Sequence, residues 1–422
     1  MYKKTTFKNG LRVITVPQKE TKAVTVLVMT GTGSKYEEKK LSGISHFVEH
    51  MVFKGTKKRK GPIKVAEELD KIGGDMNAFT GEEYTGYYAK VDAAHLDIAM
   101  DWVSDIFINS TIPEEEVNKE RGVVIEEIKM FDDNPMRNIG DAWRKALYGD
   151  QPAGWFIGGT KESVLNIKRE DMLEYVHAQY NAKNTVVCIV GNFKEKQALE
   201  LAKKSFSKIP ASVTRTKVQV IEKQSEPNVY ILNKKTKQTT MALGVRGYNH
   251  LHPDKYVMDI IATLLGGMMS SRLFEEVREK LGAAYYVATY NDNETDSGSL
   301  STFAGIDSSK MNKVIETILK EYKKLKEVKV SDKELKKNKD YLKGKIILGI
   351  ESSDAKASFY CTQELLKNKI TSVEEIIKKI EKVTANDIMR VAKDIFKEEK
   401  LNLAIIGPYK GKEEEFKKLL KF

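Results

Sequence analysis

Cysteine and histidine are scarce in this chain, which has two cysteines and six histidines among 422 residues. Cys188 lies in the apolar run TVVCIV, which is typical of a small buried side chain. With Cys361 as the other cysteine, the sequence offers no disulfide framework and no cysteine-rich metal site. We therefore expect a protein of a reducing, cytoplasmic compartment.

Long apolar runs are also missing. No stretch approaches the roughly 18 consecutive apolar residues that indicate a transmembrane helix, so we expect no membrane association through a spanning segment. The first residues, MYKKTTFKNGLRV, lack the apolar core of a secretory signal. We expect no such signal here, with an already trimmed mature form as the alternative.

The charge is basic but finely mixed. Lysine and arginine number 71 against 60 acidic residues, a net charge of +11. The lysines interleave with acids, as in KKLKEVKVSDKELKKNKD, which is typical of a solvated helix face. Without an aromatic-basic motif we expect no nucleic-acid partner. The length and a hydrophobic fraction of 41% indicate a globular protein of two or three domains.

The most informative segment is the pentapeptide His46-Phe47-Val48-Glu49-His50. On an α-helix, Glu49 and His50 lie within about 60° of His46 around the axis, so all three side chains face one point. Two imidazole nitrogens make half of a tetrahedral zinc site, and a free carboxylate beside them can act as a general base. The order is that of the inverted zinc-protease motif HxxEH.

The same pentapeptide has a structural alternative. Its neighbours predict one buried helix face, formed by Ile44, Phe47, Val48, Met51 and Val52. The two histidines could simply flank that face. The choice between the two interpretations depends on a third ligand, since catalytic zinc usually has three protein ligands.

Residues 113–131 are the best source of that ligand. Pro113 and three following glutamates suit the first turn of a helix, and the next apolar residues recur at helical spacing. Glu120 and Glu127 are two turns apart and share a face beside the apolar stripe. Either they are solvated glutamates, or Glu127 is the third zinc ligand and Glu120 accepts a hydrogen bond from a ligand imidazole.

With these residues in place, the chain resembles the pitrilysin and insulin-degrading enzyme family of zinc peptidases. HFVEH is followed 77 residues later by Glu127, inside ERGVVIEEIKM. The length resembles the short branch, which includes mitochondrial processing peptidase subunits and bacterial relatives. Further agreement lies in GISHFVEHMVFKGT, GGDMNAFTGEEYTGYY and SSRLFEEVREKLGAAYYV, so the resemblance runs from about Lys8 to Gly407.

The resemblance implies a zinc-dependent endopeptidase that cleaves peptides or unfolded segments. One Zn²⁺ per chain would be held by His46, His50 and Glu127, with Glu49 as the general base. The alternative is a non-catalytic peptide-binding or assembly subunit of a processing complex, as some members are. Such members typically lose ligands or the base, and this chain retains them all.

The chain also contains a diverged internal repeat. EDMLEYVHAQYNAKNTVVCIVGN, from Glu170, aligns without a gap with NDIMRVAKDIFKEEKLNLAIIGP, from Asn386, at an offset of 216 residues. Each copy predicts a helix, an apolar strand and a charged helix. We expect two tandem homologous domains, residues 1–210 with the zinc motif and residues 228–422, joined by a linker at 211–227. Strands and helices do not alternate strictly, which predicts an α+β fold with an antiparallel-rich sheet in each domain.

The stretch GGDMNAFTGEEYTGYYAKVD predicts a β-hairpin, with one strand at 76–80 and the return strand at 84–91. The hairpin could be sheet structure only. The family resemblance implies that Asn77, Ala78 and Phe79 form an exposed edge that binds peptide by strand addition. An unpaired edge offers backbone donors and acceptors to any extended chain.

In the second half, Arg278 and Tyr285 flank a predicted helix-to-strand corner, with Gly282 as a helix C-cap. By themselves they are a surface arginine and a strand tyrosine. The resemblance implies that Tyr285 donates to the developing oxyanion and that Arg278 holds a substrate carbonyl or carboxylate. It also implies a homodimer that forms a chamber, in which this pair completes the zinc site of the other protomer.

Overall fold

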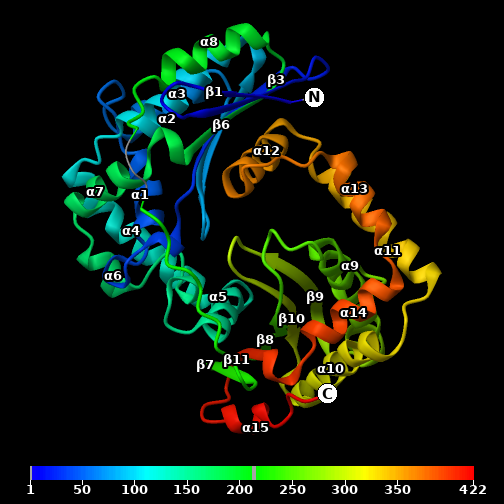
Figure 1. Cartoon of the computed structure of the whole chain (residues 1–422). Helices are drawn as coiled ribbons and strands as arrows, with labels where there is room; N and C mark the ends of the chain where they lie inside the picture. The colour runs from blue at the N-terminus through cyan, green and yellow to red at the C-terminus, as the bar shows by residue number, and fades with distance from the viewer. Residues whose placement is uncertain (1, 212–214) are drawn as a thin grey trace. The chain divides into compact units, whose positions relative to one another are not determined.

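The structure, a computed structural model, describes residues 2–211 and 215–422. Within these residues the strands form two sheets, in the orders β1-β2-β6-β3-β5-β4 and β7-β11-β8-β10-β9. Helices pack against both sheets (Figure 1). Each sheet has a single parallel pair, β2 with β6 and β7 with β11, and its other pairs are antiparallel. This confirms the predicted α+β class with antiparallel-rich sheets.

The first compact unit comprises Met1–Lys129, Phe156–Val218 and Leu348–Thr371. Its strands are β1 (Lys3–Thr6), β2 (Arg12–Pro17), β3 (Ala23–Thr30), β4 (Asp75–Thr80), β5 (Thr85–Asp92) and β6 (Thr185–Gly191). Its helices are α1 (Ile44–Val52), α2 (Pro62–Asp70), α3 (Leu96–Asn109), most of α4 (Glu114–Asp133), α6 (Lys161–Asn166), α7 (Arg169–Gln179), α8 (Glu195–Phe206) and α12 (Ser353–Lys367).

The second compact unit comprises Met130–Trp155, Gln219–Ile347 and Ser372–Phe422. Its strands are β7 (Asn228–Asn233), β8 (Thr239–Arg246), β9 (Ala284–Asn293), β10 (Gly298–Ile306) and β11 (Leu401–Gly407). Its helices are α5 (Pro135–Tyr148), α9 (Lys255–Gly266), the π-helical segment Phe274–Lys280, α10 (Met311–Glu327), most of α11 (Asp332–Gly349), α13 (Val373–Lys382), α14 (Ala385–Ile395) and α15 (Glu413–Lys417). Among the described residues, no helix is long and apolar enough to cross a membrane.

The internal repeat corresponds to equivalent strands in the two sheets. Three pairs of strands begin 216 residues apart, namely β2 and β7 at Arg12 and Asn228, β3 and β8 at Ala23 and Thr239, and β6 and β11 at Thr185 and Leu401. In each sheet the first and last strands of these three pair in parallel. The offset read from the sequence is therefore repeated in the strand topology.

The first sheet is buried on both faces, which explains its continuous apolar strands. Along β3, Val24, Val26 and Val28 pack with α1 and α3, because alternate side chains point to one face. Leu27 and Met29 point to the other face, where α12 lies. Figure 1 shows α12, far along the chain, beside the strands of the first sheet. The two apolar layers hold the sheet in a fixed position behind α1.

The compact units differ from the predicted division at 211–227 in two places. Helix α5 belongs to the second unit, and α12 belongs to the first. The reason is packing: α5 buries Ile139, Trp143 and Ala146 against Ala242, Ala404 and Ile406 of the second sheet. Likewise, Ala357 and Cys361 of α12 pack with Leu27, Met29 and Cys188. Both cysteines are buried in that layer, as predicted for Cys188. A sequence repeat does not reveal which sheet a helix covers.

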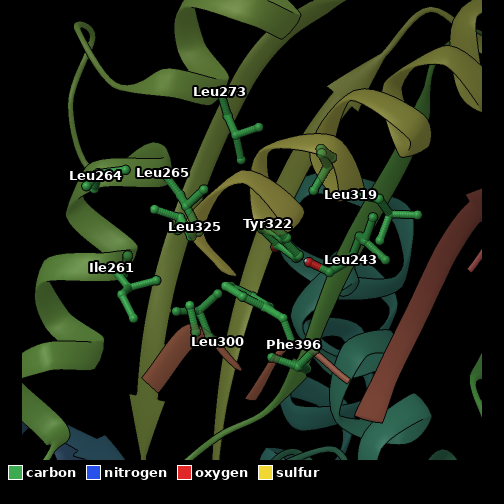
Figure 2. Packing of buried hydrophobic residues seen from close by; sticks show 14 of the residues in the cluster. Leu243, Ile261, Leu264, Leu265, Leu273, Leu300, Leu319, Tyr322, Leu325 and Phe396 are labelled. Carbon is green, nitrogen blue, oxygen red and sulfur yellow. Dashed lines mark hydrogen bonds between the residues drawn. The ribbon is translucent and has the colours of Figure 1, made fainter. Parts of the chain in front are cut away.

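The core of the second unit is organised around Tyr322 of α10 (Figure 2). The Tyr322 ring stacks on Phe396, with 4.4 Å between ring centroids. Its hydroxyl lies 2.7 Å from the Thr302 hydroxyl and donates to the Leu243 carbonyl oxygen at 3.0 Å. One side chain thus links α10 with strands β8 and β10.

We expect Tyr322→Phe to lower the free energy of unfolding of the second unit by about 1 kcal/mol, because the buried Thr302 and Leu243 oxygens lose a partner. Urea denaturation measures the change. Tyr290→Phe, at a side chain that is 54% exposed, is the matched control and should stay within about 0.5 kcal/mol of the parent. Equal losses in both variants would contradict this account.

Candidate active site

The residue before helix α1 must be a glycine. Gly43, just before it, has a φ of 92°. A side chain there would be strained and would also collide with the Gly158 carbonyl oxygen, 2.6 Å from an ideal Cβ. The buried Glu37 carboxylate accepts from the backbone N–H groups of Gly43 and Ser45, at 2.7 and 2.8 Å. A carboxylate at a helix N-terminus satisfies free donors and favours the helix dipole.

One face of α1 is buried in the core of the first unit, as the apolar pattern predicts. Ile44, Phe47, Val48 and Met51 are at most 1% exposed. The histidines flank this face, so the structural alternative describes the packing correctly. It does not describe the whole site, because of what helix α4 brings beside it.

Helix α4 runs over Glu114–Asp133, close to the predicted 113–131. It buries Val117 and Val124 in the same core as α1. Glu120 is almost completely buried, and Glu127 is half-buried on the same side of the helix. The structure thus brings both predicted glutamates to the histidines, whereas Glu126 stays exposed and pairs with Lys129.

Three side chains form the cluster. Glu127 Oε2 lies 3.3 Å from His50 Nε2 and 3.6 Å from His46 Nε2, and all three ligand atoms lie within 4.8 Å of one another. Tetrahedral zinc with bonds of about 2.0–2.2 Å separates its ligand atoms by about 3.3–3.6 Å. The donor set and its spacing therefore fit a zinc ion. The side chains are 16–30% exposed, so the cluster remains open to solvent.

The Nδ1 atoms of the two imidazoles differ in their hydrogen bonding. His50 Nδ1 donates to Glu120 Oε1 at 2.8 Å, and Glu120 Oε2 lies 2.5 Å from Lys54 Nζ. This bond leaves His50 Nε2 to face the cluster and fixes the ring. His46 Nδ1 is buried and has no hydrogen-bond partner among the described residues. Packing therefore orients the Nδ1 side of His46, and Glu127 lies 3.6 Å from its Nε2.

The electrostatics of the cluster suit a cation. Burial and the neighbouring His50 lower the pKa of His46 to about 4, so His46 is neutral. Burial also opposes the charge on His50, but hydrogen bonds to Glu120 and Glu127 outweigh it and raise the pKa to about 9. The bond from His50 lowers the pKa of Glu127. The raised pKa favours the imidazolium form of His50, and a bound cation would replace that positive charge.

Glu49, the predicted base, is half-buried beside the cluster. Burial raises the pKa of its carboxyl group, and a hydrogen bond from Thr80 partly opposes the shift. In that bond the Thr80 hydroxyl donates to Glu49 Oε2 at 2.5 Å. A carboxyl group whose pKa is moved toward neutrality is suited to taking up and releasing a proton.

The predicted substrate residues lie on β4, which is an edge strand of the first sheet. The hairpin matches its predicted position, with β4 at Asp75–Thr80 and β5 at Thr85–Asp92. Asn77 Oδ1 accepts from the backbone N–H of Ala78 at 2.9 Å. Phe79 points to the opposite face of the sheet, where it packs edge-on against Tyr84. An open edge is thus present near Glu49.

Arg278 and Tyr285 lie together in the second unit. The Arg278 guanidinium is 5.9 Å from the centroid of the Tyr285 ring, and Tyr285 is 72% exposed at the start of the edge strand β9. Gly282, with a φ of 53°, occupies the predicted corner. Their approach to the histidine cluster stays a prediction.

Sequence reasoning missed Lys54 and Thr80. Lys54 follows His50 by four residues, a spacing that brings side chains together at a helix end, and this could have indicated its role. For Thr80, the only sequence feature that points to its role is its position at the end of a predicted strand. Its contact with Glu49 depends on how the hairpin packs against α1.

The chain belongs to peptidase family M16. Residues 12–161 match the family model described as Insulinase (Peptidase family M16), and residues 166–342 match the model described as Peptidase M16 inactive domain. A Bacillus subtilis protein named an uncharacterized zinc protease is 36% identical over 408 residues, which cover 97% of this chain and 98% of that protein. This confirms the family resemblance found in the motifs.

A second relative and a solved structure agree with this family assignment. A Streptomyces coelicolor protein, also named an uncharacterized zinc protease, is 31% identical over 417 residues, covering 97% of this chain and 90% of that protein. The crystal structure of a protease from Helicobacter pylori matches with a TM-score of 0.90 and 26% identity, covering 97% and 99% of the two chains.

We expect Glu120→Gln to weaken zinc binding about 10–100-fold, because the neutral amide no longer supports the imidazole of His50 as a carboxylate does. Titration against a competing chelator measures the affinity. Glu126→Gln, one residue before the cluster glutamate but exposed, is the control and should bind zinc like the parent. An unchanged affinity in Glu120→Gln would refute the supporting role.

Proposed function

We propose that this protein is a zinc-dependent endopeptidase that cleaves peptides or unfolded segments. The observation that carries the proposal is the convergence of His46, His50 and Glu127 within 4.8 Å, beside the carboxylate of Glu49. The names of the relatives, which call them zinc proteases, support it. Each chain would hold one Zn²⁺ through the two Nε2 atoms and the carboxylate of Glu127.

Zinc, when bound, supplies a Lewis acid that makes water more acidic and polarises a carbonyl group. The protein supplies the proton transfer. Glu49 takes a proton from the attacking water and passes it to the leaving amine. Tyr285 donates a hydrogen bond to the oxygen on which negative charge develops, and Arg278 holds a carbonyl or carboxylate of the substrate.

The substrate would bind along β4 as an added strand. The free edge of β4 offers backbone groups to an extended chain, and Asn77, Ala78 and Phe79 form the central part of that edge. Recognition through backbone atoms depends little on the side chains of the peptide. The substrate class is therefore extended or unfolded segments, because a folded protein rarely exposes a backbone in this form.

We expect Glu49→Gln to reduce kcat about 10²–10⁴-fold on a quenched peptide library, because glutamine cannot accept the proton. Its zinc content, measured by metal analysis, should stay at the parental level, since the three ligands are untouched. Glu38→Gln, at an exposed glutamate upstream of the same helix, is the matched control and should retain activity. Parental rates in Glu49→Gln would refute the mechanism.

Chelation separates this proposal from its alternative, a non-catalytic peptide-binding or assembly subunit. The match to the model described as an inactive domain is the reason to test that alternative. The match covers residues 166–342 and does not include the pentapeptide at 46–50. A peptidase loses activity on chelation and regains it with zinc. If the zinc-loaded protein binds peptides but does not cleave them, the alternative is correct.

We further propose that the working form is a homodimer enclosing a chamber. Arg278 and Tyr285 of one protomer would complete the zinc site of the other, giving two sites. Tyr285 is 72% exposed and the half-buried Arg278 lies beside its ring, which leaves the Tyr285 side chain available to a partner. The resemblance implies a chamber closed by two halves of two domains each, and this chain supplies one such half with both the zinc motif and the Arg278–Tyr285 pair.

Mixing two inactive variants tests the arrangement. Glu49→Gln and Tyr285→Phe should each be nearly inactive, and their mixed dimers should regain activity, because one site then combines an intact Glu49 with an intact Tyr285 from the other chain. At equal amounts, half of the dimers are mixed and each has one working site, so about a quarter of the parental rate is expected. No recovery after subunit exchange would mean that each chain completes its own site.

We also propose a cytoplasmic location. Cys188 and Cys361 pack in one apolar layer and are free thiols. Adjacent unbridged thiols are typical of proteins kept in a reducing compartment.

A further inference from the structure

The carboxylate of Glu49 has a single hydrogen-bond donor among residues 2–211 and 215–422, the hydroxyl of Thr80. The donated bond reaches Oε2, and Oε1 has no partner in the same residues. Glu49 lies on α1, and Thr80 is the last residue of β4. The expected base is therefore held in place by the strand that is expected to bind the substrate.

The orientation of Thr80 follows from the packing of β4. Met76 and Ala78 pack against the core that contains α1, whereas Phe79 points to the opposite face of the sheet. Because alternate side chains share a face, Thr80 belongs with Met76 and Ala78. Its hydroxyl therefore faces α1 as a consequence of strand register, and the contact with Glu49 is fixed by the hairpin.

The backbone of the same residues faces the open edge. Gly81 donates to the carbonyl oxygen of Tyr84 at 2.8 Å, which makes these two a hydrogen-bonded pair. Hydrogen-bonded and non-bonded pairs alternate in an antiparallel ladder, so Thr80 and Ala78 direct their backbone groups away from β5. The bond from Ala78 N–H to the Asn77 side chain agrees with this. Thr80 thus has its hydroxyl on Glu49 and its backbone at the edge.

We propose that Thr80 is a positioning residue that sets the orientation of Glu49 relative to a peptide bound along β4. The proposal rests on the proposed peptidase function. A peptide that pairs with the edge is held by the backbone of β4, and the base is held by a side chain of the same strand. Strand β4 therefore positions both the scissile bond and the Glu49 carboxylate. The unbonded Oε1 of Glu49 is then available to accept the proton of the attacking water.

The test uses the full-length zinc-loaded protein and the valine and serine variants of Thr80. Valine has the shape of threonine and suits a strand, so Thr80→Val removes the donor and keeps the edge. A base misplaced by a fraction of an ångström to 1 Å lowers turnover, so kcat should fall about 10–100-fold. KM should stay within about twofold, because the backbone of β4 is unchanged. Thr80→Ser keeps a hydroxyl donor and should restore most of kcat.

Thr85→Val is the matched control, since Thr85 lies opposite Thr80 in the ladder and donates to Thr32 rather than to Glu49. It makes the same chemical change and should leave kcat near the parental value. Zinc content and the unfolding temperature are measured for every variant.

The positioning role is overturned if Thr80→Val keeps the parental kcat, if Thr80→Ser loses as much as the valine variant, or if the control loses as much. These failures occur against an active parent. A zinc-loaded parent that hydrolyses no peptide overturns the proposed function itself, so the two failures are distinguishable.

Discussion

The burial of one face of α1 is the constraint on which the site depends. Ile44, Phe47, Val48 and Met51 are fixed in the core, and the histidines on the borders of that face cannot rotate away. Helix α4 is anchored in the same core through its valines. Two helices that pack on a common core bring the polar residues at the borders of their apolar stripes together. The cluster of His46, His50 and Glu127 thus results from hydrophobic packing, with polar groups at the border of the core.

The same arrangement raises an electrostatic problem and solves it with charge pairs. Burying ionisable groups is unfavourable unless they are paired. Glu120 is compensated by Lys54 and by His50, and Glu127 by His50. His46 has only the more distant Glu127, 3.6 Å from its Nε2, and burial keeps it neutral. The hydrogen bonds among Lys54, Glu120 and His50 therefore orient one imidazole, whereas the Nδ1 side of His46 is held by packing.

Much of this could be predicted from the sequence, because helical spacing is a local property. The spacing within HFVEH and the seven residues between Glu120 and Glu127 indicated the faces of both helices correctly. The strand pattern located the hairpin of β4 and β5 to within one residue. Thr80 and the exchange of α5 and α12 between the units could not be predicted, since they depend on packing between segments distant in the chain. The 216-residue repeat matches the positions of three strands in each sheet, but it does not indicate which sheet a helix covers.

The hydrogen bond from Ala78 N–H to the Asn77 side chain has a consequence for how the molecule behaves at high concentration. An unprotected edge strand invites pairing with other chains and leads to aggregation. Here a self-supplied amide oxygen occupies one of the outward donors, so a visiting strand gains nothing at that position unless it displaces the amide. Fleeting encounters between copies are discouraged, whereas a long peptide that forms several bonds in succession can compete. The edge of β4 therefore favours long extended peptides over brief contacts between copies of the protein.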